Sequence, residues 1–198
     1  MTDFILHKKK LVSEEKCNEI IRIFEKDKTI QEGSFGSEKN INENLKKCSE
    51  IYVNTGQSVN DNKYNPLFIN ELMVALEEYK EKFPFLNKIE KWGMCNQYKI
   101  QRYYPNEGFF LLHCENYGPI MLKSKELCPT SYRTLVWMVY LNDVTDGGYT
   151  EFPTQKKLIA PRTGDILIWP AFWTHPHRGI TSKTQTKYIV TGWWTHSL

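Results

Sequence analysis

The second half of the sequence contains a series of short apolar segments that are separated by turns, with no helical pattern between them. Turn sequences such as Asp146-Gly147-Gly148 mark the boundaries of these segments. The predicted strands are residues 97–104, 109–115, 134–141, 149–152, 157–160, 165–169, 175–180 and 187–194. Eight short strands without intervening helices indicate a double-sheet jelly roll.

The first part of the chain has a different pattern, and it predicts two helices. Residues 13–27 form an amphipathic segment, with Ser13 at the N-cap position. The second predicted helix runs from residue 66 to about residue 82. Pro66 suits its first turn, and apolar residues recur behind it at helical spacing.

The segment between the predicted helices, residues 30–64, is rich in Gly, Ser, Asn and Lys. We expect surface loops there, with one strand at 50–53, and we expect the segment to border the mouth of any active site. The whole chain, residues 1–198, is predicted to be a single α+β domain. Residues 1–92 would supply helical support and loops, with the helices packed on the major sheet of a jelly-roll core at 93–198.

Composition narrows the class of protein further. A chain of 198 residues is long enough for one core, and its net charge of +3 is too small to indicate a nucleic-acid or membrane partner. The five cysteines are odd in number and lack CxxC spacing, which argues against a disulfide framework. The N-terminus has no signal-peptide pattern, and the longest apolar run is far too short to span a membrane. We therefore expect a cytoplasmic protein.

His113 and Glu115 form an H-x-E pair at the end of a predicted strand. Residues at positions i and i+2 of a strand point to the same face, so both side chains can reach a single metal ion. Taken alone, the pair could be a half-exposed histidine beside a surface carboxylate. Four apolar residues precede it, however, and polar groups so close to a core need partners or a metal. We therefore predict a metal site.

A second histidine is needed to complete such a site, and the sequence offers His175 and His177. The two share strand parity, so side-chain alternation cannot separate them. Gly179 places His177 in an H-x-G setting, and we predict that His177 is the ligand. His175 could support the ligands by a hydrogen bond or pack in an aromatic cluster beside Trp173. Two imidazoles and one carboxylate leave coordination positions free, as in non-heme Fe(II) oxygenases. The same three groups could instead hold Zn²⁺ in a jelly roll without enzymatic activity.

Lys187 begins the last predicted strand and shares one face of it with Trp193. If that face points into the barrel, the ammonium group is buried and needs an anion, which a dicarboxylate cosubstrate would supply. Tyr103 and Thr150 are candidate hydroxyl donors to the same anion. The alternative is a solvated lysine at a strand end, which is the commonest environment of this residue type.

From about residue 95 onward the sequence resembles the Fe(II)/2-oxoglutarate-dependent dioxygenases of the prolyl 4-hydroxylase-like branch, above all the small single-domain members of bacteria and bacteriophages. The family motif is H-x-D, a distal histidine in H-x-G, and a basic residue ten positions later. Its counterparts here are His113 with Glu115, His177 and Lys187. Further similar segments are residues 133–144, 147–153 and 164–165.

The resemblance implies a double-stranded β-helix that binds Fe(II) through the two histidines and Glu115. It also implies that 2-oxoglutarate chelates the iron and that its far carboxylate pairs with Lys187. Tyr103, Thr150 and Trp193 would belong to the cosubstrate site, and ascorbate is an optional further cofactor. The cosubstrate would be converted to succinate and CO₂ as the substrate gains an oxygen atom.

The resemblance further implies a proline in a peptide or protein as the substrate. Arg133 matches a residue that lines the peptide groove, although it could instead pair with a carboxylate such as Glu151. A small molecule, another side chain or a nucleic-acid base is the alternative substrate, and Lys187 argues against nucleic acid because several branches acting on it use arginine. The sequence departs from the family at three positions: Glu115 replaces aspartate, Phe110 replaces tyrosine and Thr195 replaces histidine.

Overall fold

The computed structural model describes residues 2–36, 40–56, 58–89 and 91–196. The α-helices are α1 (Glu14–Glu25) and α2 (Ile69–Lys82), and short 3-10 helices lie at Val59–Asp61, Asn65–Leu67, Pro84–Lys88 and Pro129–Tyr132. The strands are β1 (Leu6–Lys8), β2 (Gln31–Glu32), β3 (Lys46–Lys47), β4 (Ser49–Asn54), β5 (Trp92–Met94), β6 (Gln97–Tyr103), β7 (Gly108–Phe109), β8 (Arg133–Tyr140), β9 (Thr150–Phe152), β10 (Lys157–Ile159), β11 (Ile166–Pro170), β12 (Arg178–Gly179) and β13 (Lys187–His196).

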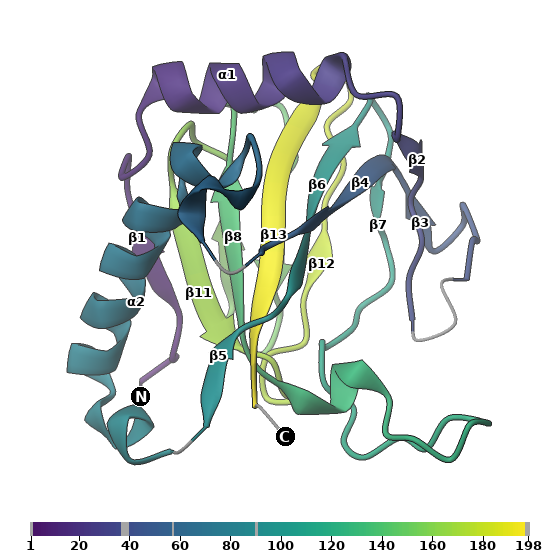
Figure 1. Cartoon of the computed structure of the whole chain (residues 1–198). Helices are drawn as coiled ribbons and strands as arrows, with labels where there is room; N and C mark the ends of the chain where they lie inside the picture. The colour runs from purple at the N-terminus through teal and green to yellow at the C-terminus, as the bar shows by residue number, and fades with distance from the viewer. Residues whose placement is uncertain (1, 37–39, 57, 90, 197–198) are drawn as a thin grey trace.

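A large antiparallel sheet dominates the structure (Figure 1). Its strands follow the order β1-β11-β8-β13-β6-β4-β2, and β5 pairs with the far end of β13. A second sheet has the order β10-β9-β12, and β3 pairs with β7. All of these pairings are antiparallel. The chain is therefore mostly antiparallel sheet with two α-helices, as the strand pattern predicted.

Helix α1 forms where the sequence predicted it, across the ends of the sheet strands (Figure 1). The Ser13 hydroxyl accepts a hydrogen bond from the Lys16 amide at 3.3 Å and so caps the helix. Cys17, Ile20 and Phe24 recur at helical spacing and are fully buried against the sheet. The apolar stripe, together with its cap, explains both the position of the helix and the face that it buries.

Helix α2 also packs on the sheet, beside β11, but it begins later than predicted. Pro66 lies in the 3-10 helix Asn65–Leu67, and the backbone of Phe68 then leaves the helical region, with φ at −155°. The α-helix starts at Ile69. Pro66 therefore belongs to a separate short 3-10 helix and not to the α-helix.

Successive side chains of β13 point alternately to the two faces of the large sheet. Val190 and Trp194 pack into the core beneath the helices. Ile189 and Trp193 belong to a second core, between the large sheet and the smaller β10-β9-β12 sheet, and Lys187 points to the same side. The prediction that Lys187 and Trp193 share one face is therefore confirmed, and that face points inward.

Two predicted strands are much shorter than expected. The segment predicted at 109–115 forms a strand only at its start, in β7, and the segment predicted at 175–180 forms only β12. The cause at the first site is a local break in the ladder, because the amides of Phe110 and Leu111 both donate to the carbonyl of Leu45. The prediction that His113 and Glu115 lie on a regular strand is therefore wrong.

The part of the chain before β6 also supplies strands that the sequence pattern did not indicate. β1 forms one edge of the large sheet, β5 pairs with β13, and the segment predicted as loops contains β2 and β3 besides β4. Strands of two or three residues are too short to show a period of two. All five cysteines are free, as expected, and no described helix is long and apolar enough to cross a bilayer.

Candidate metal and cosubstrate site

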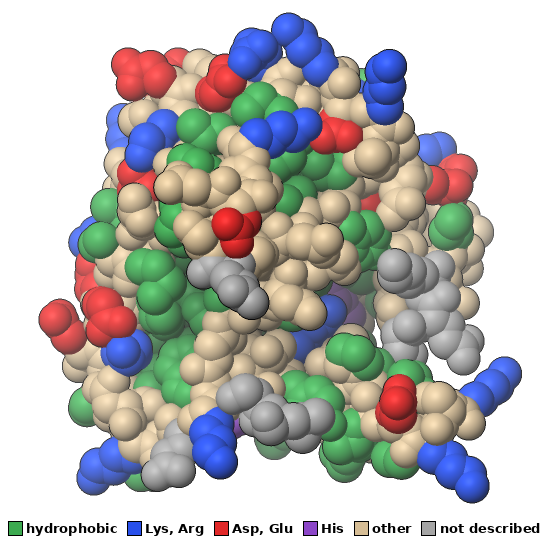
Figure 2. Space-filling model, in the orientation of Figure 1, with side chains coloured by type: hydrophobic (Ala, Val, Ile, Leu, Met, Phe, Trp, Pro, Cys, Tyr) green, Lys and Arg blue, Asp and Glu red, His purple; other side chains and the backbone are tan. Residues whose placement is uncertain are grey.

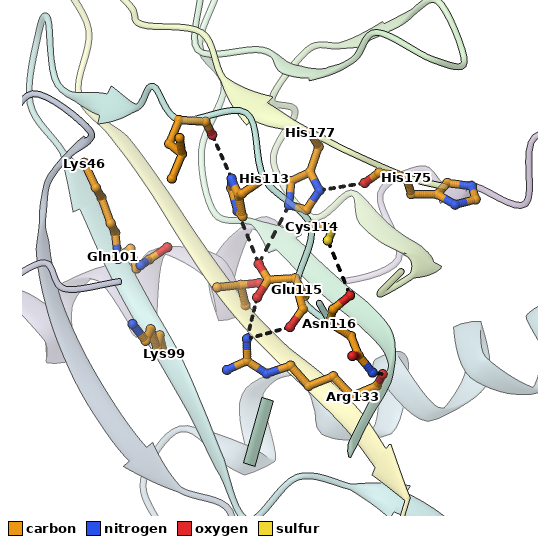
Figure 3. Close-up of polar contacts among 12 residues, drawn as sticks. Lys46, Lys99, Gln101, His113, Cys114, Glu115, Asn116, Arg133, His175 and His177 are labelled. Carbon is orange, nitrogen blue, oxygen red and sulfur yellow. Dashed lines mark hydrogen bonds and ion pairs between the residues drawn. The ribbon is translucent and has the colours of Figure 1, made fainter. Parts of the chain in front are cut away.

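A pair of backbone hydrogen bonds brings the two halves of the predicted metal motif together. The amide of His113 donates to the carbonyl of His177 at 3.0 Å, and the amide of His177 donates back to His113 at 2.8 Å. The amide of Glu115 donates to the carbonyl of Ala171 at 3.0 Å, which fixes the third residue. The three side chains converge in the close-up view of Figure 3. One ligand atom from each residue lies within 4.8 Å of the other two.

The hydrogen bonds of the two imidazoles fix which ring nitrogen is free. His113 Nδ1 lies 2.8 Å from the carbonyl of Leu111, and His177 Nδ1 lies 3.1 Å from the carbonyl of His175. A carbonyl only accepts, so both Nδ1 atoms carry the proton and both Nε2 atoms present a lone pair. These Nε2 atoms lie 3.4 and 3.8 Å from Glu115 Oε1. Three electron-pair donors thus face one another, and such an arrangement fits a cation between them.

The protonation of these groups suits a metal ligand set. Burial lowers the pKa of His177 to about 3, so the ring is neutral at physiological pH. Burial alone would raise the pKa of Glu115, but the contacts with His113 and Arg133 outweigh it and hold that pKa below its usual range. A neutral imidazole and an ionised carboxylate are the forms that bind a metal ion.

Arg133 contacts the carboxylate of the triad. Its Nη1 donates to Glu115 Oε2 at 2.6 Å, which leaves Oε1 for the two histidines, and the guanidinium stacks on the ring of Trp193 at 3.6 Å. Glu151, the alternative partner considered from the sequence, instead accepts from Arg178 at 2.5 Å. The alternative of an Arg133–Glu151 pair is therefore wrong, and Arg133 pairs with Glu115.

The side chain of His175 points away from the triad. Its Nε2 contacts the backbone carbonyl of Asp3 at 2.8 Å, and its Nδ1 contacts the hydroxyl of Thr174 at 2.9 Å. Only its backbone carbonyl supports the triad, by accepting from His177. Of the two candidate distal histidines, the structure therefore brings His177 and not His175 beside Glu115.

Lys187 lies in the same cavity as the triad and is the first residue of β13. Its ammonium group is buried and donates to the carbonyl of Gly148 at 2.8 Å, and it lies 5.3 Å from the ring centroid of Tyr103. Among the described residues no carboxylate forms an ion pair with it. Burial lowers the pKa of Lys187 to about 8. A buried ammonium group without a counter-charge is suited to an anionic ligand.

The two predicted hydroxyl donors line this end of the cavity, but each already has a partner. Tyr103 donates to Gln101 Oε1 at 3.0 Å, and the Thr150 hydroxyl lies 2.6 Å from that of Tyr140. The Gln101 amide group donates to Glu50 at 2.7 Å, so its oxygen must face Tyr103. The single proton of Tyr103 is therefore directed toward Gln101.

The cavity that joins these groups has a volume of about 530 Å³. Figure 2 shows a hollow on one face of the molecule, with histidine and basic side chains at its bottom. The segment 30–64, which the sequence placed at the mouth, borders the cavity through Phe35, and the segment that follows the ligand Glu115 borders it through Tyr117. Arg133, Trp193 and the triad line the same space.

Two polar residues that line this cavity, Lys99 and Gln101, were not identified from the sequence, nor was the buried Glu50 that accepts hydrogen bonds from both. The sequence did contain a signal for part of the set. Gln97, Lys99 and Gln101 alternate with Tyr98 and Ile100 along β6, a pattern that places polar side chains on one face of the strand. Pairing with Glu50 depends on the neighbouring strand β4, and no local pattern indicates it.

Comparisons with solved structures show a shared fold. The chain is similar to a viral collagen prolyl hydroxylase from Paramecium Bursaria Chlorella virus-1, solved as a 2OG complex, with a TM-score of 0.61 and 18% identity over 98% of this chain and 97% of that one. It is also similar to a Pseudomonas putida prolyl-4-hydroxylase, with a TM-score of 0.67 and 13% identity over 97% and 92% of the two chains.

A third structure, a prolyl hydroxylase from Trichoplax adhaerens in complex with a peptide fragment of the hypoxia inducible factor oxygen degradation domain, has a TM-score of 0.70 and 12% identity. It covers 98% of this chain and 84% of that one. No curated protein matches the sequence. Residues 98–195, which include the triad and Lys187, match the 2OG-Fe(II) oxygenase superfamily. The chain therefore belongs to the 2OG-Fe(II) oxygenase superfamily, enzymes that use Fe(II) and 2-oxoglutarate.

Proposed function

We propose that this enzyme hydroxylates a proline in a peptide or protein, with Fe(II) bound by His113, Glu115 and His177. The observation that carries the proposal is the convergence of two imidazole lone pairs and one carboxylate oxygen within 4.8 Å, in a cavity that also holds a buried lysine. The fold shared with prolyl hydroxylases supports the choice of a peptide substrate. In this proposal the antiparallel sheets form the double-stranded β-helix of that family.

In this proposal the residues at one end of the cavity bind the cosubstrate, and those at the other end bind the iron. Lys187 would anchor the far carboxylate of 2-oxoglutarate, with Tyr103 and Thr150 completing that end of the cosubstrate site. Trp193, which the resemblance also assigned to this site, lies six residues along β13 from Lys187, so we place it outside the cosubstrate site. The bound iron would supply the oxidative chemistry, in which 2-oxoglutarate, O₂ and a substrate C–H group become succinate, CO₂ and a hydroxylated substrate. The buried aromatic walls would exclude water from the reacting groups.

Arg133 has a different role in this proposal from the one suggested by its match to a peptide-groove residue. Because it already binds Glu115 Oε2, it would hold the carboxylate so that only Oε1 faces the histidines. Glutamate is one methylene longer than the aspartate usual in the family, so its carboxylate needs such a constraint more. Arg133 would thus be a positioning residue for the metal ligand.

The direct test is to load the protein anaerobically with Fe(II), add 2-oxoglutarate and O₂, and screen a library of proline-containing peptides by mass spectrometry. We expect succinate release, and the gain of one oxygen atom on proline in a subset of peptides. Succinate release with modification only of another side chain, a metabolite or a nucleobase would leave the oxygenase activity in place and reject proline. A protein that binds metal without releasing succinate would reject both the oxygenase activity and proline as the target.

The free cysteines support our further proposal that the enzyme works in a reducing, cytoplasmic environment.

A further inference from the structure

A buried charge cluster forms the wall of the cavity on the side of β4 and β6. Lys46 Nζ donates to Glu50 Oε2 at 2.6 Å, and Lys99 Nζ donates to Glu50 Oε1 at 3.0 Å. Both ammonium groups also donate to the carbonyl of Ser34, at 2.8 and 3.2 Å. The Lys46 side chain is 2% exposed, Glu50 is fully buried and Lys99 is 12% exposed. Figure 3 shows Lys46 and Lys99 on the side of the cavity opposite the triad.

This cluster carries one more positive charge than negative. Burial would raise the pKa of Glu50, but the two lysines outweigh it and lower that pKa to about 2, so the carboxylate is ionised. One carboxylate therefore serves two ammonium groups. Lys99, the more exposed of the two, lines the cavity and lies 4.6 Å from the ring centroid of Tyr52. A surplus charge in so enclosed a place is stabilised when a ligand brings an anion.

The other basic side chains around the cavity do not share this surplus. Arg133 is paired with Glu115, and Arg178 is paired with Glu151. Lys187 is unpaired, but it belongs to the opposite end of the sheet. Among the lining residues that the structure describes, Lys99 is therefore the cation that remains for a second ligand.

The strand register separates Lys99 from the proposed cosubstrate anchor. On β13, Thr191 pairs with Lys99, whereas Lys187 pairs with Tyr103. Four residues along an antiparallel strand span roughly 13 Å, so an anion held at Lys187 does not neutralise Lys99. The surplus charge of Lys99 lies beside Thr191, which is closer along β13 to Trp193 than to Lys187.

Trp193 provides a second, independent sign of a missing partner. Its side chain lines the same cavity, and its indole Nε1 is buried with no hydrogen-bond acceptor among the described residues. An unpaired buried N–H costs about 1–3 kcal/mol, so an acceptor on a ligand would relieve it. An ammonium group and an indole N–H on one wall form a suitable pair of donors for a carboxylate.

We propose that Lys99 and Trp193 bind a carboxylate of the substrate, so that the enzyme selects peptides with an aspartate or glutamate near the target proline. This inference rests on the proposed peptide hydroxylation and adds the class of peptide. The competing explanation is that the cluster only fastens the segment around Ser34 to the sheet. A purely structural cluster would affect all peptides equally, whereas a binding cluster discriminates by charge.

The test uses pairs of proline-containing peptides that differ only by Glu or Gln at one flanking position. These two side chains have nearly the same shape, so the comparison isolates the charge. Binding is measured by fluorescence anisotropy and turnover by the gain of oxygen on proline. At one flanking position we expect the wild type to prefer Glu about tenfold, the size of one charge-assisted hydrogen bond.

Three variants identify the source of this preference. In Lys99→Gln the cluster becomes a neutral Lys46–Glu50 pair, and the Glu preference should fall to near one, whereas Lys99→Arg should retain it. Lys123→Gln removes an exposed lysine outside the cavity and should leave the preference unchanged. Thermal unfolding of each variant confirms that it is folded.

The outcomes separate this inference from the proposed function. Hydroxylation of Glu and Gln peptides at equal rates, or a preference that survives in Lys99→Gln, overturns the anion site and leaves proline hydroxylation standing. Glu-selective binding without any hydroxylation supports the site and rejects proline as the target. Failure of every peptide to bind overturns both.

Discussion

The two ends of the cavity are built from different kinds of backbone. Lys187 and Tyr103 stand opposite each other on β13 and β6, two regular strands of the large sheet. His113 and Glu115 lie on an irregular segment, which is held by a reciprocal pair of backbone hydrogen bonds between His113 and His177 and by one from Glu115 to Ala171. The sheet thus provides a rigid floor for the cosubstrate, whereas the geometry of the metal ligands depends on a few local contacts. Mutations should therefore separate metal binding from cosubstrate binding.

Replacing a ligand at the metal end should have the largest effect. We expect His177→Ala to lower metal affinity by more than about 100-fold, beyond the effect usual for residues that only support a ligand. His175→Ala is the matched control, because its ring contacts Asp3 and Thr174 instead of the triad. Metal content after equilibrium dialysis would measure both. Loss of metal in His175→Ala with retention in His177→Ala would reverse our assignment of the distal ligand.

At the sheet end, Lys187→Ala should raise the KM for 2-oxoglutarate by about 30- to 100-fold, since a buried charge-assisted contact is lost. Metal content should stay near that of the wild type, because Lys187 does not contact the triad. The exposed Lys183→Ala is the control for a lost charge nearby. Wild-type decarboxylation of 2-oxoglutarate by Lys187→Ala would remove the anchoring role.

Substitutions of Arg133 test whether the irregular segment that carries Glu115 needs a side chain from β8 to hold the carboxylate in place. We expect Arg133→Gln to weaken metal binding about tenfold, because Glu115 loses the group that orients it. Arg133→Lys should restore part of the affinity with its single donor group. Titration with Co(II), followed by its absorption bands, measures affinity and ligand geometry without turnover. Unchanged spectra and affinity in Arg133→Gln would show that Glu115 is held by the backbone alone.

The lowered pKa of Lys187 predicts a pH dependence that belongs only to the sheet end. The ammonium form binds the dicarboxylate, and it is lost as the pH rises through about 8. The kcat/KM for 2-oxoglutarate should therefore fall about tenfold between pH 7 and pH 9. Lys187→Arg keeps its charge over this range, so its profile should lack this fall. An identical fall in that variant would assign the titration to another group.

The smallest effect should come from Tyr103. Its proton is directed toward Gln101, so Tyr103→Phe should change the KM for 2-oxoglutarate by only about threefold, a typical neutral hydrogen bond. Gln101→Leu should free the hydroxyl for the cosubstrate and lower that KM slightly. A loss in Tyr103→Phe as large as that in Lys187→Ala would mean that the hydroxyl turns toward the cosubstrate on binding.

The sequence predicts the environment of a residue best where that environment depends on the residue's own strand or helix. That Lys187 and Trp193 share one face follows from alternation alone, and helix α1 follows from a cap and an apolar stripe. The candidate ligands His113, Glu115 and His177 were named from spacing and family resemblance, and the structure brings them together. The strand geometry expected for the first pair was wrong, because the Leu45 carbonyl draws the chain out of the ladder after β7.

What the sequence alone determined is therefore the class of fold, the helices and the set of candidate ligands, all of which depend on short-range periodicity and motif spacing. Only the tertiary structure decided which groups share a charge. It placed Arg133 on Glu115, two lysines on Glu50, and the Tyr103 proton on Gln101. The physical reason is that a buried charge takes whichever partner the neighbouring strand presents, and strand register is a property of the whole sheet.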